Sequence, residues 1–216
     1  MGIFQSQAEI DAAPRQPNAK PGDIRFEDIN GDGQINAADR TILGSYLPKF
    51  TYGANFSLNY KGFDLTIFLQ GVGGNKIYNA NKVTGQGMLR LFNAQTDVLR
   101  AWTPSNTNTD VPRAVNGDPN QNSRTSDRFI EDGSYMRIKN LVLGYSVPSS
   151  LLDSFAKGSI KSARVYFSAQ NLLTFTKYTG YDPEVGSRGN NNLTNGIDYG
   201  QFPQARTLML GVQFGF

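Results

Sequence analysis

The stretch TLMLGVQFGF, residues 207–216, ends the sequence and carries the strongest indication of the fold. Every second residue in it is apolar, which gives a β-strand one apolar face and one smaller or more polar face. The apolar set consists of Leu208, Leu210, Val212, Phe214 and Phe216. In a soluble sheet such a bare apolar edge is an aggregation hazard, whereas strands of an outer-membrane β-barrel present an apolar face to lipid. The stretch therefore favours a barrel strand.

Four earlier segments show the same period of two: residues 52–60, 63–70, 140–147 and 164–170. Their second face carries Asn, Gln, Ser and Gly, and few of the Lys and Glu residues that cover a soluble domain. A soluble β-sandwich also alternates, so the weak charge of this face decides in favour of the barrel. We therefore predict an all-β fold that contains about five antiparallel transmembrane strands.

The connections between these segments differ in length. Lys61-Gly62 forms a short turn, and residues 148–162 leave room for a helical turn, whereas residues 71–134 and 171–204 are long and rich in Gly, Asn and Thr. Barrels of this kind have short periplasmic turns and long extracellular loops. Tracing the chain backwards from a periplasmic C-terminus predicts that both long connections, and residues 1–49 before the first strand, are extracellular.

Five strands are too few to close a barrel, for which about eight are the practical minimum. The sequence is therefore predicted to be a piece of a larger barrel. Its extracellular segment would comprise residues 1–49, and its strands with their loops would comprise residues 50–216. Within the first segment, the short DIRF of residues 23–26 is the one candidate for a strand.

The N-terminal segment contains DINGDGQINAAD, residues 28–39, whose spacing is that of a calcium loop. Oxygen-bearing side chains stand at its first, third, fifth, ninth and twelfth positions, with glycine at the sixth, and calcium binds about six to eight oxygen ligands. The predicted structural Ca²⁺ would be held by Asp28, Asn30, Asp32, the main-chain carbonyl of Gln34, Asn36 and Asp39. The extended PGDIRF before the loop makes it dockerin-like, without the entering helix of an EF-hand. The alternative is an Asx-rich turn in which Asn36 caps a short helix over residues 37–44.

Composition excludes several classes of function. The 216 residues include no Cys and no His, which removes disulfides, the usual zinc sites, and Ser-His-Asp or Cys-His catalysis. The net charge of +3 is scattered, and no basic run suggests nucleic acid. The mean hydropathy is −0.42, and no apolar stretch approaches the ~20 residues of a membrane helix. We predict no catalytic residues, no enzyme activity and no nucleic-acid partner.

Six stretches, taken in order, resemble the C-terminal part of SusC/RagA-type TonB-dependent outer-membrane transporters of Bacteroidota. They are GIFQSQAEI, PGDIRFEDINGDGQI, RAWTPSNTNTDVPRA, DGSYMRIKNLVLGYSVP, ARVYFSAQNLLTFTKYTGYDPE and LMLGVQFGF. The resemblance covers nearly the whole chain. It implies a multi-pass 22-stranded transmembrane β-barrel in the cell outer membrane, in contact with lipid, of which this chain would be roughly the last quarter.

The resemblance also implies a function for the parent protein. Such transporters import oligosaccharides or peptides with energy delivered through TonB, and a SusD/RagB-like surface lipoprotein covers the barrel as a lid. The plug domain and the TonB box that contact this machinery belong to the missing N-terminal part. The fragment alone is therefore expected to transport nothing.

Three aromatic residues are candidates for contact with substrate or lid. Trp102 lies in a predicted extracellular loop, where it could stack on a sugar, although clamping the loop together with Pro104 and Pro112 is the favoured role. Tyr178 and Tyr181 could face a ligand or the lid, and an aromatic girdle at the membrane boundary explains them equally well. Arg113 is expected to fix the same loop as Trp102 by hydrogen bonding.

The main rival is a soluble secreted β-sandwich, an adhesion or carbohydrate-binding module with a calcium loop. An enzyme that uses carboxylates is the third alternative, but no pair of acidic residues is placed for it. The weakly charged polar faces and the aromatic terminus favour the transporter fragment over both.

Overall fold

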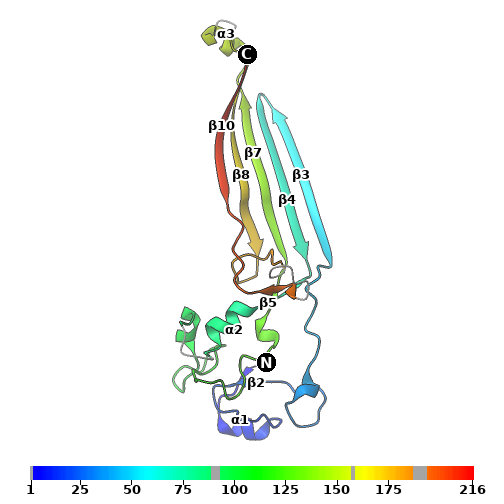
Figure 1. The fold of residues 1–216 in the computed structure, drawn as a ribbon, viewed down its shortest axis with the longest axis vertical. Coiled ribbons are helices and arrows are strands. Elements are labelled where there is room, and N and C mark those ends of the chain that lie inside the picture. The colour runs from blue at the N-terminus through cyan, green and yellow to red at the C-terminus, as the bar shows by residue number, and fades with distance from the viewer. Residues whose placement is uncertain (1, 89–92, 157–158, 187–193) are drawn as a thin grey trace. The chain divides into compact units, whose positions relative to one another are not determined.

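The computed structural model describes residues 2–88, 93–156, 159–186 and 194–216 (Figure 1). The chain forms two compact units, and each is discontinuous in sequence. The sheet unit comprises Ser45–Ile77, Asp132–Val185 and Gln201–Phe216, and the loop unit comprises Met1–Gly44, Tyr78–Glu131 and Gly186–Gly200. Among the described residues, no helix has both the length and the apolar composition needed to cross a membrane.

The sheet unit contains five antiparallel strands in the spatial order β10-β8-β7-β4-β3. They are β3 (Phe50–Tyr60), β4 (Phe63–Gly73), β7 (Tyr135–Ser146), β8 (Ser162–Thr176) and β10 (Thr207–Gly215). The five predicted strands are confirmed, and three of them run further into the long connections than their alternation indicated. The extra length lies at the ends of β4 and β8 and at the start of β7.

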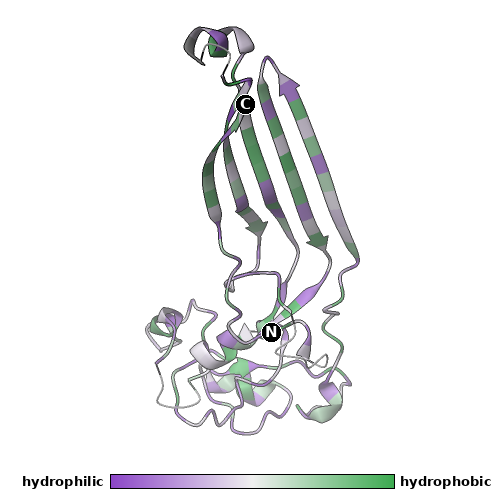
Figure 2. Ribbon diagram, turned by 45° about the horizontal axis from the view of Figure 1, so that its top comes forward, coloured by the Kyte–Doolittle hydropathy of each residue, from purple (hydrophilic) through white to green (hydrophobic). Residues whose placement is uncertain are grey.

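The register of the sheet confirms its two faces. Along one row, Phe56 pairs with Ile67, Ile67 with Leu141, Leu141 with Ala169, and Ala169 with Leu208. Neighbouring rows of this face are also apolar, and Figure 2 shows the alternation along each strand. Many of these side chains are exposed, among them Leu210 at 83%. A contiguous exposed apolar face of this kind marks a surface for contact with another protein or with a membrane.

Strand direction places the connections at two ends of the sheet. Lys61-Gly62 joins β3 to β4, and the connection between β7 and β8 at the same end contains helix α3 (Ser149–Ala156), which confirms the expected helical turn. Because neighbouring strands are antiparallel, the chain before β3 and the long connections from β4 to β7 and from β8 to β10 all leave at the opposite end. Residues 187–193 of the last connection lie outside the described residues.

The loop unit has little regular structure. Its short elements are β1 (Gly2–Ile3), α1 (Gln7–Ala12), β2 (Ile24–Arg25), η1 (Ala37–Asp39), β5 (Lys76–Asn79), α2 (Ala80–Gln86), η2 (Thr96–Arg100), η3 (Asp127–Phe129), β6 (Ile130–Asp132) and β9 (Ile197–Asp198). Of these, β5 and β6 each include residues that belong to the sheet unit. The DIRF candidate forms β2, which pairs with β1. Two-residue strands contribute few ladder hydrogen bonds, so the unit depends on its side chains.

The alternative for residues 37–44, a short helix capped by Asn36, is confirmed at its start and wrong in its length: the Asn36 side chain accepts a hydrogen bond from the Ala38 N–H at 2.8 Å. Only the three-residue 3₁₀ turn η1 forms, and Arg40, which follows it, has extended backbone. Thr41 and Ile42 are β-branched, and Gly44 disfavours a helix further. Ile42 is also 91% exposed, so no packing against the unit offsets these low propensities.

The two compact units do not coincide with the two predicted segments, residues 1–49 and 50–216, although the first strand of the sheet does begin at Phe50. The N-terminal 44 residues fold together with residues 78–131, and no motif in the sequence links the two segments. Hydrogen bonds between residues about a hundred positions apart tie these segments to one another. The loop unit is therefore a folded body in its own right and more than a set of separate loops.

Candidate functional site

A buried carboxylate with several hydrogen-bond donors lies within the loop unit. Asp23 is fully buried, and Arg113 donates to it from Nε at 2.8 Å and from Nη2 at 3.1 Å. Asn122 Nδ2 and the main-chain N–H of Lys20 also donate to Asp23, at 3.0 and 2.9 Å. A paired Arg–carboxylate contact with further donors satisfies a charge that burial would otherwise make costly. The expected loop-fixing role of Arg113 is confirmed, but nothing in the sequence identified Asp23 as its partner.

Trp102 packs inside this unit. Its side chain is 8% exposed, its indole N–H donates to Gln5 Oε1 at 2.9 Å, and its ring lies against Gly22. Of the two roles that the sequence left open, this placement corresponds to the packing role. A sugar could stack on the ring only if this packing opened.

The loop of residues 28–39 is organised by its own polar side chains. Asp28 accepts hydrogen bonds from the main-chain N–H groups of Gly31 and Gly33, at 2.7 and 2.8 Å. Asp39 accepts from those of Ile29 and Asn36, at 3.0 and 2.7 Å. The Asn36 N–H contributes most to holding the pKa of Asp39 below its ordinary value. The two acidic residues at the ends of the window therefore close the loop.

The predicted ligand set shares one small loop. Asn30 Nδ2 and Asn36 Nδ2 donate to Asp32 Oδ2, at 3.1 and 3.2 Å, and Asn36 Nδ2 also approaches the main-chain oxygen of Gln34 at 3.5 Å. Among the described residues, no three acidic side chains gather around one point. A calcium ion would therefore depend on amide and carbonyl oxygens beside the carboxylates, which suits the hard, flexible coordination of this ion.

The main chain of Arg15, which lies outside the loop, pairs with it in a contact that the spacing of residues 28–39 does not predict. The Arg15 N–H donates to Gly33 O at 2.8 Å, and the Ile35 N–H donates to Arg15 O at 2.9 Å. Ile35 is buried at 8% exposure. An apolar residue at the eighth position of the window, with a polar residue on either side, was the available signal for this contact.

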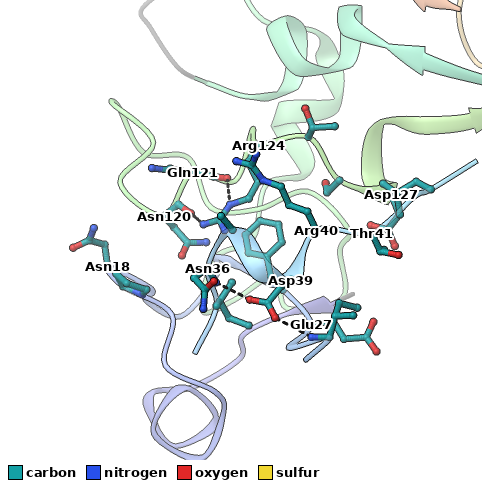
Figure 3. A pocket seen from close by; sticks show the side chains of 18 of the residues that line it. Asn18, Glu27, Asn36, Asp39, Arg40, Thr41, Asn120, Gln121, Arg124 and Asp127 are labelled. Carbon is teal, nitrogen blue, oxygen red and sulfur yellow. Dashed lines mark hydrogen bonds between the residues drawn. The ribbon is translucent and has the colours of Figure 1, made fainter. Parts of the chain in front are cut away.

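A cleft lies beside the loop of residues 28–39, within the loop unit, and Figure 3 shows the residues around it. One wall is formed by residues 35–43 and another by residues 119–127. Arg124 stacks on the Phe26 ring at 4.0 Å and donates to the main-chain oxygens of Asn120 and Gln121, at 3.0 and 3.3 Å. Burial lowers the pKa of Arg124 from its ordinary value.

The sheet unit has its own buried ion pair. Arg137 of β7 is 2% exposed and donates to Asp182 Oδ1 at 2.6 Å and to Glu184 Oε2 at 2.8 Å. Burial raises the pKa of Asp182, but the main-chain N–H groups of Gln204 and Glu184 and the Arg137 side chain together lower it below its ordinary value. This contact holds the segment after β8 against β7.

The two tyrosines of that segment lie in different environments. Tyr178 is 6% exposed and its ring packs on Gly180, whereas Tyr181 is 74% exposed. Of these two tyrosines, only Tyr181 has an exposed ring. The sequence predicted the same environment for the two tyrosines, whereas the structure buries Tyr178 and exposes Tyr181.

The polar face carries an ion pair that spans an intervening strand. Arg164 of β8 donates from Nε to Asp64 Oδ1 of β4 at 2.9 Å, although β7 lies between these strands. Gly144 of β7 occupies the crossing point, and a Cβ there would lie 2.4 Å from both the Arg164 and the Asp64 side chains. The absence of a side chain at residue 144 therefore allows this contact.

No family model matches the chain, but related proteins do. TonB-dependent receptor P3 of Formosa agariphila is 43% identical over 92% of this chain, and TonB-dependent receptor P26 of the same organism is 34% identical over the whole chain. TonB-dependent receptor SusC of Bacteroides thetaiotaomicron is 31% identical over 92% of it. These matches cover 19%, 22% and 18% of the respective relatives, so the chain spans about a fifth of their length.

Solved structures agree with this relationship. The RagAB peptide transporter superposes with a TM-score of 0.68 and 33% identity, over 85% of this chain and 19% of that one. The RagAB peptide importer in its closed-closed state superposes with the same TM-score over 88% of this chain. These relatives are receptors and transporters, which confirms the prediction that the chain is no enzyme.

Proposed function

The chain belongs to the SusC/RagA-type TonB-dependent receptors of the outer membrane, and from this premise we propose that it supplies the C-terminal strands of a 22-stranded importer barrel. The observation that carries the proposal is the five-stranded sheet with one exposed apolar face. In the complete barrel, lipid would cover this face and the polar face would line the interior. The unpaired edges of β3 and β10 would continue into the remaining strands.

We propose that the parent protein imports oligosaccharides or peptides, with energy from TonB and with a SusD/RagB-like lipoprotein as its lid. The long connections leave one end of the sheet together, which is the arrangement of extracellular loops in such barrels. The loop unit would then face the outside and the lid. Tyr181 is the candidate residue best placed for such contact, because its ring is exposed.

We further propose that the loop of residues 28–39 holds a structural Ca²⁺ with the ligands predicted from its spacing. Its closure by Asp28 and Asp39 and its main-chain pairing with Arg15 support this role. An extracellular segment with little regular structure benefits from an ion that restrains it without a hydrophobic core. When bound, the ion would supply positive charge to a carboxylate-rich loop and would take no part in chemistry.

Uptake by cells that express the full-length parent tests the main proposal. Labelled oligosaccharide and peptide pools are expected to enter in a manner that requires the parent gene and stops when the proton-motive force is dissipated. Cells that express only residues 1–216 should show no uptake, because the energy-coupling parts lie elsewhere. Equal uptake with and without the parent gene would overturn the proposal. A detergent-free, monodisperse monomer of residues 1–216 would favour the soluble sandwich instead.

A further inference from the structure

A shallow groove of about 660 Å³ lies on the apolar face of the sheet. Phe50 and Tyr52 of β3 form one wall, and Phe175 of β8 belongs to the other. One row of the ladder joins Tyr52 to Phe175 through residues of β4 and β7, so both rings lie on the same face. Every lining residue belongs to the sheet unit, so the groove does not depend on how the two units are placed.

Glycines of β4 make room for this groove. A Cβ at Gly73 would lie 2.3 Å from the Phe50 ring, and a Cβ at Gly71 would lie 2.1 Å from the Tyr52 ring. The two rings therefore lie over the main chain of β4, and the floor of the groove at Gly73 and Gly74 carries no side chain. Aromatic walls beside such a floor leave space for a chain of methylene groups.

The groove lies at one border of the band that lipid would cover. The strand β3 has 11 residues from Phe50 to Tyr60, and its ten residue-to-residue steps extend about 33 Å. A strand tilt of about 40° reduces this to about 25 Å, the height of the apolar band in outer-membrane barrels. Aromatic residues mark the other border too, where Phe63 and Tyr145 stack at 4.6 Å. The groove is therefore at the level where lipid headgroups begin, on the side of the long connections.

Positive charge gathers at this end of the groove. Lys177 and Asp132 both line it. The Ser134 hydroxyl and N–H, which donate to Asp132 at 2.7 and 3.0 Å, contribute most to lowering the pKa of this carboxyl, and the charges of Lys76 and Lys177 lower it further. Both ammonium groups therefore lie near Asp132, whose oxygen is already hydrogen-bonded within the protein.

A third lysine adds to the excess of positive charge. The side chain of Lys49 packs over the floor of the groove. Lys49, Lys76 and Lys177 are exposed, and the lysine ion pairs of the described residues involve Lys82 and Lys139 instead. Three lysines beside one aspartate attract an anion, and the aromatic walls favour an anion that carries an apolar chain.

We propose that this groove binds an anionic lipid of the outer leaflet, with an acyl chain along Phe50, Tyr52 and Phe175 and a headgroup phosphate against Lys76 and Lys177. Basic residues beside an apolar membrane surface attract anionic headgroups in this way. A protein partner suits the groove less well, because its walls continue into the face that lipid covers in the proposed barrel. This inference rests on the proposed function, since only a membrane-spanning barrel brings the groove to the headgroups.

The test uses the full-length parent, purified in detergent, and measures bound lipid by native mass spectrometry during a titration. The probes are lipid A, a glycolipid with two phosphates, and the same lipid after enzymatic removal of both phosphates. Lys76→Ala together with Lys177→Ala should weaken lipid A binding about 25-fold, because each lysine near a membrane surface contributes about fivefold. Binding of the dephosphorylated lipid should not change.

Two further variants sharpen the result. Lys61→Ala together with Lys161→Ala is the matched control, because it removes two exposed lysines from the opposite end of the sheet, and it should bind lipid A as the wild type does. Phe175→Ala should weaken the binding of both lipids by about tenfold, because it removes apolar contact with the acyl chain. Heat-modifiable migration of each variant checks that its barrel is folded.

Three results would overturn the site. They are equal binding of the two lipids by the wild type, unaltered lipid A binding by the Lys76 and Lys177 double variant, and displacement of lipid A by an equal concentration of inorganic phosphate, which would mean that only a free anion is bound. The two proposals fail in different ways. A parent that migrates as a folded barrel without preference for the phosphorylated lipid refutes only the lipid site, whereas a parent that forms no heat-modifiable barrel refutes the proposed function.

Discussion

The sheet unit and the loop unit are stabilised by different kinds of contact. In the sheet unit, long antiparallel ladders satisfy the main chain, and the apolar face has few partners within the chain. In the loop unit, regular elements are short, and buried polar side chains such as Asp23 and Asn120 connect segments that are distant in sequence. Damage to a single side chain should therefore be local in the sheet and far-reaching in the loops.

The largest effect is expected from Arg113→Ala. This change leaves the fully buried Asp23 without its charged partner, and an uncompensated buried charge costs about 3–5 kcal/mol. The loop unit of the full-length protein should become sensitive to protease while the barrel keeps its heat-modifiable migration. Arg100→Ala is the matched control, because its ion pairs with Asp97 and Asp110 are exposed and contribute at most about 1 kcal/mol. Equal protease sensitivity in the two variants would show that the Asp23 network does not hold the unit.

The next effect tests the apolar face of the sheet. Leu210 of β10 is 83% exposed, and an arginine at a lipid-facing position near the bilayer midplane costs about 2–4 kcal/mol. Leu210→Arg in the parent should lower the amount of folded, heat-modifiable barrel in the outer membrane. Gln213→Arg, on the polar face of the same strand, should have a much smaller effect. If the two variants fold in equal amounts, the two faces do not meet lipid and water as proposed.

The sheet unit could be predicted from the sequence to a much greater extent than the loop unit, because its pattern is local. Side chains of a strand alternate by local geometry alone, so the five strands, the turn at Lys61-Gly62 and the helix near residue 150 were visible. Arg113 and Asp23 are 90 positions apart, and neither has a local pattern that identifies the other. The same holds for the cleft, because its walls come from residues 17–43 and 119–127. The bulge of β7 between Ile138 and Asn140 also has no periodic signature.

A smaller effect is expected from the loop of residues 28–39, for which we propose a bound Ca²⁺. Asp28→Asn together with Asp32→Asn removes two carboxylates of the predicted ligand set and should abolish calcium binding measured by isothermal titration. A tenfold excess of calcium over its Kd would stabilise the wild-type unit by about 1.4 kcal/mol, and the double variant should lack this gain. Protease cleavage between Pro21 and Lys49 should become faster in the variant, and in the wild type with a chelator. Asp11→Asn, which removes a carboxylate outside the loop, serves as the control. If calcium neither binds nor slows this cleavage, the loop is an Asx-rich turn alone.

The smallest effect concerns the strained turn at the cleft. Gln121 has φ of 55°, a conformation that costs a non-glycine residue about 1–2 kcal/mol. Glycine adopts this conformation without strain but loses more chain entropy on folding. Gln121→Gly should therefore stabilise the loop unit by about 0.5–1 kcal/mol. Gly117 gives the reverse experiment in the same segment, since its φ is 81° and a Cβ there would meet nothing within 4 Å. Gly117→Ala should therefore destabilise the unit by about the same amount, through conformation alone. Amide hydrogen exchange of residues 117–127 in the full-length protein measures both changes. Equal and opposite shifts would show that backbone conformation at residues 117 and 121 sets the stability of this turn. If Gln121→Gly instead loosens the turn, contacts of the Gln121 side chain stabilise the fold by more than its backbone strain costs.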